Sequence, residues 1–90
     1  MHLAQNPKTA YRILEGEAVI VDPSSSMLYS LNPIATLIWE ESSQGTTMEE
    51  IVNRVMDEFE VERTVAERDC LEFARDFMDR GLLVVTENLC

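Results

Sequence analysis

Apolar residues recur at every third or fourth position over residues 64–82, toward the C-terminal end of the chain. This spacing places them along one face of an α-helix whose other face is mostly charged. Thr64 and Glu67 have the S/T-x-x-E spacing of a capping box, which predicts the first turn. Arg80 followed by Gly81 predicts the last turn, because glycine readily adopts the left-handed conformation that ends many helices. The predicted buried stripe is Val65, Ala66, Cys70, Phe73, Ala74, Phe77 and Gly81, widened by Leu71, Met78 and Leu82.

Two shorter helices are expected before the long one. An Asn-Pro pair at residues 32–33 is a favourable helix start, since asparagine caps and proline tolerates the first helical position. The first helix should span residues 33–42. Thr47 and Glu50 form a second capping box, which opens a helix over residues 47–58. The expected apolar faces are Ile34, Leu37 and Ile38 with Trp39 half buried, then Met48, Ile51, Val52, Val55, Met56 and Phe59.

Three strands are predicted upstream of these helices, over residues 10–15, 17–22 and 27–31. A Glu-Gly pair between the first two strands predicts a tight hairpin turn. The sequence Asp-Pro-Ser-Ser-Ser before the third strand is a cluster of turn-forming residues. Three consecutive antiparallel strands would make a meander with residues 27–31 at its edge. Residues 82–85 form either a final short strand or an extended tail.

The order of elements predicts one α+β domain. An N-terminal three-stranded antiparallel sheet is followed by three helices, in a winged-helix-like arrangement. Residues 1–9 are polar and show no apolar period, so we expect a flexible tail there. The single domain should occupy residues 10–85, and residues 86–90 should form a C-terminal tail.

Charge and composition exclude several classes of function. The formal net charge is −10, from 17 acidic and 7 basic side chains, and this charge repels a nucleic-acid backbone. No apolar run approaches the ~20 residues of a membrane span, and no signal peptide is visible. Cys70 and Cys90 do not suggest a disulfide framework, so we expect a reducing, cytoplasmic environment.

The sequence offers no catalytic or metal-binding constellation. His2 is the only histidine, and neither cysteine has a histidine neighbour for nucleophilic catalysis or zinc ligation. We therefore expect no catalytic residues, no metal and no cofactor. The carboxylates of the long helix are interpreted as a solvated face or, alternatively, as a docking surface for a basic partner.

Several short motifs follow one another along the chain: Leu31-Asn32, Ala35 to Trp39, Thr47 to Ile51, Asp69, and Gly81 to Leu83. Together they resemble the PqqD-like family. The resemblance spans roughly residues 16–85 and depends on the order and spacing of the motifs. It implies a RiPP recognition element, a non-catalytic module that binds the leader of a ribosomally made precursor peptide. Such modules present the peptide to a modifying enzyme, often a radical SAM protein, in the biosynthesis of pyrroloquinoline quinone (PQQ) or of another modified peptide.

The resemblance also implies where the peptide binds. The leader adds as a further strand beside the third strand and lies against the long helix. The peptide-binding residues implied in this way are Met27, Leu28, Tyr29, Ser30, Val65, Arg68, Asp69 and Glu72. The predicted meander agrees with this binding mode in one respect, because its third strand is an edge. An exposed edge strand is commonly covered or used for strand addition.

Two other functions remain open at the level of sequence. A winged-helix DNA-binding regulator would suit the order of the helices, although its recognition helix would be diluted by acidic residues. A homodimeric interaction subunit with paired edge strands is the third possibility.

Overall fold

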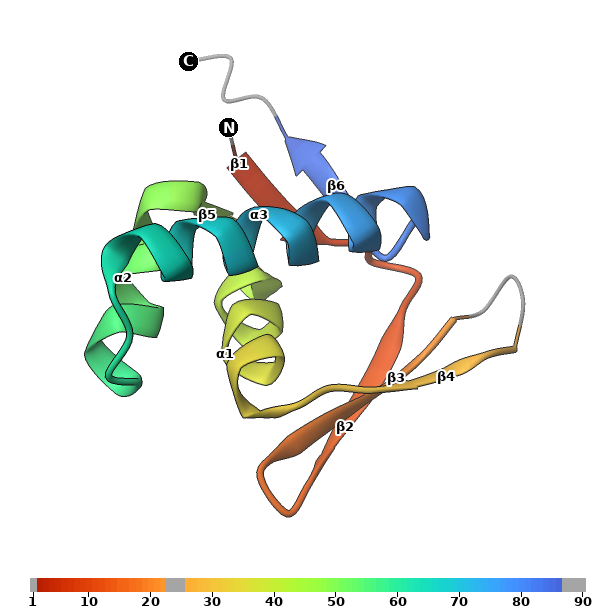
Figure 1. The fold of residues 1–90 in the computed structure, drawn as a ribbon. Helices are drawn as coiled ribbons and strands as arrows, with labels where there is room; N and C mark the ends of the chain where they lie inside the picture. Colours follow the sequence, from red (N-terminus) through yellow and green to blue (C-terminus); the bar gives the residue numbers. More distant parts are fainter. Residues whose placement is uncertain (1, 23–25, 87–90) are drawn as a thin grey trace.

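The computed structural model describes residues 2–22 and 26–86, which form two small antiparallel sheets and three α-helices (Figure 1). The strands are β1 (His2–Gln5), β2 (Ala10–Leu14), β3 (Glu17–Val21), β4 (Leu28–Ser30), β5 (Thr46–Thr47) and β6 (Leu83–Thr86). The helices are α1 (Pro33–Glu41), α2 (Met48–Glu58) and α3 (Arg63–Asp79), with a short 3-10 turn, η1 (Ser42–Gln44), after α1. The predicted α+β order, a three-stranded antiparallel sheet followed by three helices, is confirmed.

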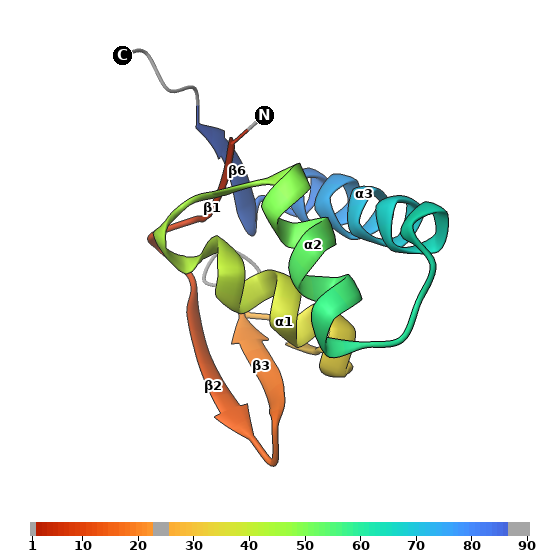
Figure 2. The ribbon, with the colours of Figure 1, turned by 90° about the vertical axis from the view of Figure 1, so that its left-hand side faces the viewer.

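The first sheet has the strand order β2-β3-β4. Glu15 and Gly16 both have positive φ, 53° and 83°, which is the conformation of a type I′ hairpin turn between β2 and β3. Ala18 and Ile20 on the inner face of β3 are completely buried. Figure 2 shows the β2–β3 hairpin projecting beyond α1, so only part of this sheet is covered by helices.

A second sheet, which the sequence did not predict, has the order β5-β1-β6. The prediction of a flexible tail over residues 1–9 is therefore wrong for His2–Gln5. This strand pairs along its whole length with β6, with Leu3 opposite Val85. Leu3 is completely buried in the helical core. The segment 82–85, left open between strand and tail, forms most of β6, and residues 87–90 lie outside the described residues.

Replacing Leu3 with alanine should lower the free energy of unfolding by about 2–5 kcal/mol, because the truncation leaves a cavity in a small core. Urea denaturation followed by circular dichroism measures the change. Lys8→Ala, at an exposed position in the following turn, is the matched control and should denature like the wild type. A Leu3→Ala variant with an unchanged midpoint would show that β1 does not contribute to the core.

Asn6 fixes the connection between β1 and β2. Its backbone N–H donates to the Leu82 carbonyl at 2.9 Å, and its side-chain amide donates to the Gly81 carbonyl at 2.8 Å. The Lys8 N–H donates to the Asn6 side-chain oxygen at 3.0 Å, a local bond of the kind that stabilises turns. The first residues of the chain are thus tied to the segment that follows α3.

The helix α1 begins as predicted. The Asn32 side-chain oxygen accepts the Ala35 N–H at 2.8 Å, and Pro33 occupies the first helical position. Trp39 was expected to be half buried, but it is completely buried between the first sheet and α3. Its ring contacts the rings of Tyr11 and Phe77, at centroid distances of 5.6 and 6.1 Å.

The helix α2 also begins as predicted, whereas α3 does not. The Thr47 hydroxyl accepts the Glu50 N–H at 3.2 Å, which confirms the cap of α2. In α3 the N-cap is Glu62, without a side-chain cap, so the predicted Thr64–Glu67 capping box is wrong. Thr64 already lies inside the first turn, and Glu67 instead forms an ion pair with Arg63 at 3.6 Å.

The end of α3 matches the prediction at Gly81, whose φ is +76°. The Leu82 N–H donates to the Phe77 carbonyl at 2.9 Å and the Gly81 N–H to the Met78 carbonyl at 3.0 Å. This pair of bonds is a Schellman motif. It directs the chain from α3 into β6, which pairs with β1.

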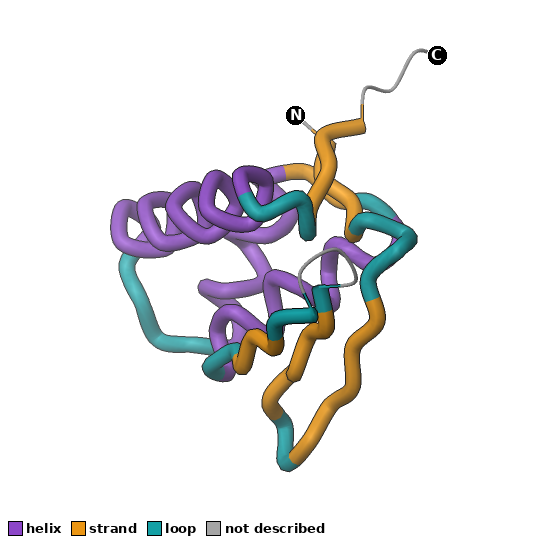
Figure 3. Tube along the Cα trace, turned by 90° about the vertical axis from the view of Figure 1, so that its right-hand side faces the viewer, coloured by secondary structure: helices purple, strands orange, loops and turns teal. Residues whose placement is uncertain are grey.

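The buried residues form two clusters, and α3 contributes to both. One cluster joins the three helices to β1, and the other joins the first sheet to Trp39 and to the C-terminal part of α3. Phe73 and Met78 pack against both clusters. Figure 3 shows the resulting arrangement, with the helices on one side and the strands of the first sheet extending away from them. Within the described residues, no helix has the length and apolar character needed to cross a membrane.

Candidate functional site

The outer edge of β4 has no strand beside it among the described residues, because β4 is the last strand in the order β2-β3-β4. The hydrogen bonds at the two ends of the β3–β4 ladder define its register. The Asp22 N–H donates to the Met27 carbonyl at 2.9 Å. The Leu31 N–H donates to the Ala18 carbonyl at 2.8 Å. Directly opposite residues of two antiparallel strands alternate between pairs that exchange main-chain hydrogen bonds and pairs that do not. Asp22/Met27 and Ala18/Leu31 are hydrogen-bonded pairs, so the next hydrogen-bonded pair lies midway between them.

That central bonded pair is Ile20 and Tyr29, which lie opposite each other. The main-chain groups of Tyr29 therefore face inward, toward β3. The main-chain N–H and C=O groups of Leu28 and Ser30 face outward, toward the free edge. The edge thus presents two donors and two acceptors to any chain that lies beside it.

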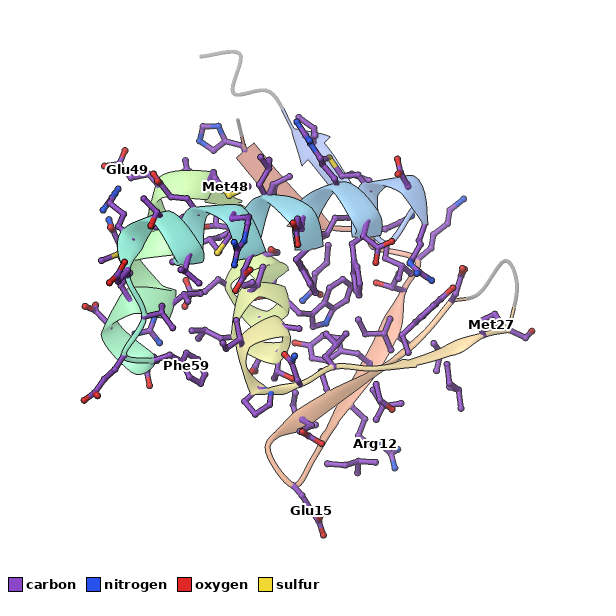
Figure 4. The ribbon with its side chains drawn as sticks, in the orientation of Figure 1. Arg12, Glu15, Met27, Met48, Glu49 and Phe59 are labelled. Atoms are coloured by element: carbon purple, nitrogen blue, oxygen red, sulfur yellow. The ribbon has the colours of Figure 1, made fainter. Side chains whose placement is uncertain are left out.

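The side chains of β4 divide between the two faces of the sheet. Tyr29 is half buried on the inner face, where its ring lies 6.4 Å from the ring of Phe77. Leu28 points to the outer face and is 65% exposed. Met27, just before β4, is also exposed, and Figure 4 shows its side chain pointing away from the body of the protein.

Arg80 joins the end of α3 to this strand. Its guanidinium carbon lies 4.9 Å from the centroid of the Tyr29 ring, and its Nε donates to the Asp76 carboxylate at 3.0 Å. Hydrogen bonding to Tyr29, and then to Asp76, raises the pKa of Arg80 above its ordinary value. The ring of Tyr29 is therefore held between Arg80 and Phe77, next to the free edge.

A groove of about 390 Å³ lies between α1 and α3. Its α1 side begins at Asn32, two residues after the end of β4. Its α3 side carries acidic residues one helical turn apart, which the helical repeat places in one row. We call this cavity the α1–α3 groove, lined by Asn32, Ile34, Ala35, Ile38, Asp69, Glu72, Phe73 and Asp76.

The structure brings together some of the residues expected from the sequence and separates others. Asp69 and Glu72 line the α1–α3 groove, close to where β4 ends. Val65 is half buried and Arg68 is exposed, and neither lines the groove. Arg68 instead forms an ion pair with Asp69 at 3.6 Å.

The apolar lining of the groove was not identified from the sequence. Ile34 and Ile38 were interpreted only as the buried face of a helix, and Phe73 only as core. These residues do pack against the core, and they also form the floor of the groove. An apolar helix residue that lines a groove has the same sequence spacing as one that is buried in the core. The sequence therefore carries no signal that distinguishes the two.

The thiol of Cys70 is poorly suited to act as a nucleophile. Cys70 is completely buried. Burial, and then the charge of Asp69, raises the pKa of its thiol to about 11, so the thiol is protonated at neutral pH. Within residues 2–22 and 26–86, no three His, Cys, Asp or Glu side chains are grouped to hold a metal ion.

The fold and the site define a small α+β module with a free edge strand beside a groove lined by acidic and apolar residues. The family described as Coenzyme PQQ synthesis protein D (PqqD) matches residues 17–83, and the chain belongs to this family. The resemblance inferred from the sequence is thus confirmed. No curated protein sequence matches the chain.

Three solved structures are similar to this one. The structure of TbiB1 in complex with the TbiA(beta) leader peptide has a TM-score of 0.84 at 24% identity, over 94% of this chain and 99% of that chain. A lasso peptide synthetase B1 complexed with its leader peptide has a TM-score of 0.80 at 25% identity, over 92% and 98%. The PqqD part of Methylobacterium extorquens PqqCD, a stand-alone RiPP recognition element, has a TM-score of 0.75 at 14% identity, over 93% and 89%.

Proposed function

We propose that this chain binds the leader of a ribosomally synthesised precursor peptide by strand addition to β4. The observation that carries the proposal is the free edge of β4, where the main-chain groups of Leu28 and Ser30 point outward. A peptide that pairs with this edge gains main-chain hydrogen bonds without needing special side chains on the protein. The Tyr29 ring, held by Arg80, lies beside the added strand.

The family of this chain and the structures similar to it also support this proposal. The chain belongs to the PqqD family, and two of the similar structures are proteins with a leader peptide bound. One of these is 25% identical to this chain and is covered almost completely. Similarity of this extent makes leader-peptide binding the expected use of this fold.

The module acts without chemistry of its own in this proposal. It holds the precursor while a separate enzyme, a radical SAM protein or another peptide-modifying enzyme of a PQQ or related pathway, modifies the rest of the peptide. Such a complex would assemble in the cytoplasm. No metal or cofactor is needed, since binding by strand addition depends on the main chain.

Binding of a leader peptide tests the proposal directly. The first step is to search for a short reading frame beside this chain's gene. The probe is the N-terminal half of the peptide that it encodes, titrated into the protein in a calorimeter. We expect saturable 1:1 binding, and no binding of the C-terminal half of the same precursor, which serves as the control. Binding of the C-terminal half alone, or of neither half, would contradict the proposal.

Two alternatives give different results in simple measurements. A DNA-binding regulator would bind duplex DNA with an affinity that falls steeply with salt, which the net charge of −10 disfavours. A homodimer that pairs β4 edges would sediment as a dimer, and a leader peptide would dissociate it. A monomer that binds the leader supports the proposed function over both.

A further inference from the structure

The α1–α3 groove begins near the end of β4, within reach of a peptide that pairs with the edge strand. Asn32 caps α1, lines the groove and lies two residues after Ser30 in the chain. A strand advances about 3.4 Å per residue, so a few residues of added peptide reach from β4 to Asn32. The groove therefore lies next to the end of the edge strand.

The floor of the groove is apolar and rigidly held. Phe73 is stacked on Phe77 with a centroid distance of 4.1 Å and an interplanar angle of 25°. Ile34, on the α1 side of the floor, is half buried and packs against the core. A volume of about 390 Å³ is at the low end of the range for binding pockets, so the groove suits individual side chains of a peptide.

The carboxylates along the α3 side differ in how far they are neutralised. Asp76 is paired with Arg80 at 3.0 Å, and Asp69 is more loosely paired with Arg68 at 3.6 Å. Glu72 lies between them on the helix, is exposed, and has no ion-pair partner among the described residues. Among the described residues, Glu72 is thus the one of these three carboxylates without an ion pair, and it shares the groove with the apolar lining.

We infer that the α1–α3 groove selects peptides in which an apolar side chain is flanked by lysine or arginine. The apolar side chain packs on Phe73 and Ile34, and the cation lies beside Glu72. This inference rests on the proposed function, because β4 must first align the peptide with the groove. It assigns Glu72 as the residue that discriminates basic from acidic leaders.

Selection from a random peptide library tests the inference without knowledge of the natural precursor. The library displays random 16-residue peptides on phage, and three immobilised proteins are compared: the wild type, Glu72→Lys and Asp57→Lys. Asp57 is exposed on α2, outside the α1–α3 groove, so its variant changes the net charge equally but leaves that groove intact. All binders are then tested on Leu28→Pro, and those that fail to bind it are classed as peptides that use the β4 edge.

Peptides retained on the wild type should be enriched in Lys and Arg next to an apolar residue, and Asp57→Lys should select the same sequences. A synthetic, fluorescein-labelled peptide from this set should bind Glu72→Lys about 3- to 10-fold more weakly at low salt, by fluorescence anisotropy. The difference should shrink at ~1 M salt, where the screening length falls to about 3 Å. Thermal melts of each variant show that the fold is intact.

The other outcomes distinguish the proposed strand addition at β4 from the proposed selectivity of the α1–α3 groove. Edge-dependent binders without a basic preference, bound equally by Glu72→Lys and Asp57→Lys, would overturn the selectivity of the groove and leave leader binding in place. Binders that depend on Glu72 but tolerate Leu28→Pro would overturn strand addition, and the inference with it. Enrichment of acidic peptides on the wild type would overturn the inference alone.

Discussion

Replacing Trp39 with alanine should lower the free energy of unfolding by about 3–5 kcal/mol, a large share of the ~5–15 kcal/mol typical of a domain. The side chain is completely buried and contacts Tyr11 of β2 and Phe77 of α3. It therefore links the first sheet to the long helix. Urea denaturation followed by far-ultraviolet circular dichroism measures the loss.

Trp39→Phe is the matched control for this change. The indole N–H has no hydrogen-bond partner among the described residues, and a buried donor without a partner costs about 1–3 kcal/mol. Phenylalanine removes that donor and keeps an aromatic ring between Tyr11 and Phe77, so its effect should be clearly smaller than that of alanine. Equal destabilisation by both substitutions would show that the ring contacts do not account for the stability.

The helices and the β2–β3 hairpin could be predicted because their signals are local. The Asn32 and Thr47 caps and the C-terminal Gly81 each depend on residues within one or two turns of the chain. The start of α3 shows the limit of such signals. Thr64 and Glu67 satisfied the pattern of a capping box, but the helix begins earlier, with Arg63 paired to Glu67.

The strand β1 could not be predicted, because its partner β6 lies at the other end of the chain. Leu3 is the one completely buried residue of a four-residue strand, and a single large apolar residue cannot establish an alternating pattern. The backbone bonds to β6, and those of Asn6 to Gly81 and Leu82, depend on the position of α3. A strand of this kind can be identified only when the tertiary arrangement of the helices is known.

The candidate site was predictable in outline and not in detail. That β4 is an edge followed from three strands in sequence, and Asp69 and Glu72 followed from the family resemblance. The α1 side of the groove could not be found in this way, since Ile34 and Ile38 have the same spacing as any buried helical face. To predict which main-chain groups of β4 face outward, one must know the register of the β3–β4 ladder. That register is defined by hydrogen bonds between strands and not by the local sequence.

Proline substitution at the two neighbouring positions of β4 should have opposite consequences. At Tyr29 the lost N–H faces Ile20, so Tyr29→Pro removes a bond of the ladder and should unfold or severely weaken the domain. At Leu28 the lost N–H faces the free edge, so Leu28→Pro should leave the fold largely intact. It should weaken binding of the leader peptide by roughly 1–3 kcal/mol, about 5- to 150-fold, because the bound peptide loses a main-chain partner.

Circular dichroism and calorimetric titration with the N-terminal half of the precursor separate these effects. Leu28→Val is the control, since it keeps the backbone N–H and changes only a side chain that is 65% exposed. Normal binding by Leu28→Val together with weak binding by Leu28→Pro would assign the effect to the main chain, as strand addition requires. If Leu28→Pro is folded and binds as tightly as Leu28→Val, the peptide does not pair with the edge of β4. If Tyr29→Pro is as stable as the wild type, the Tyr29 N–H does not bond to Ile20 and the β3–β4 ladder has a different register.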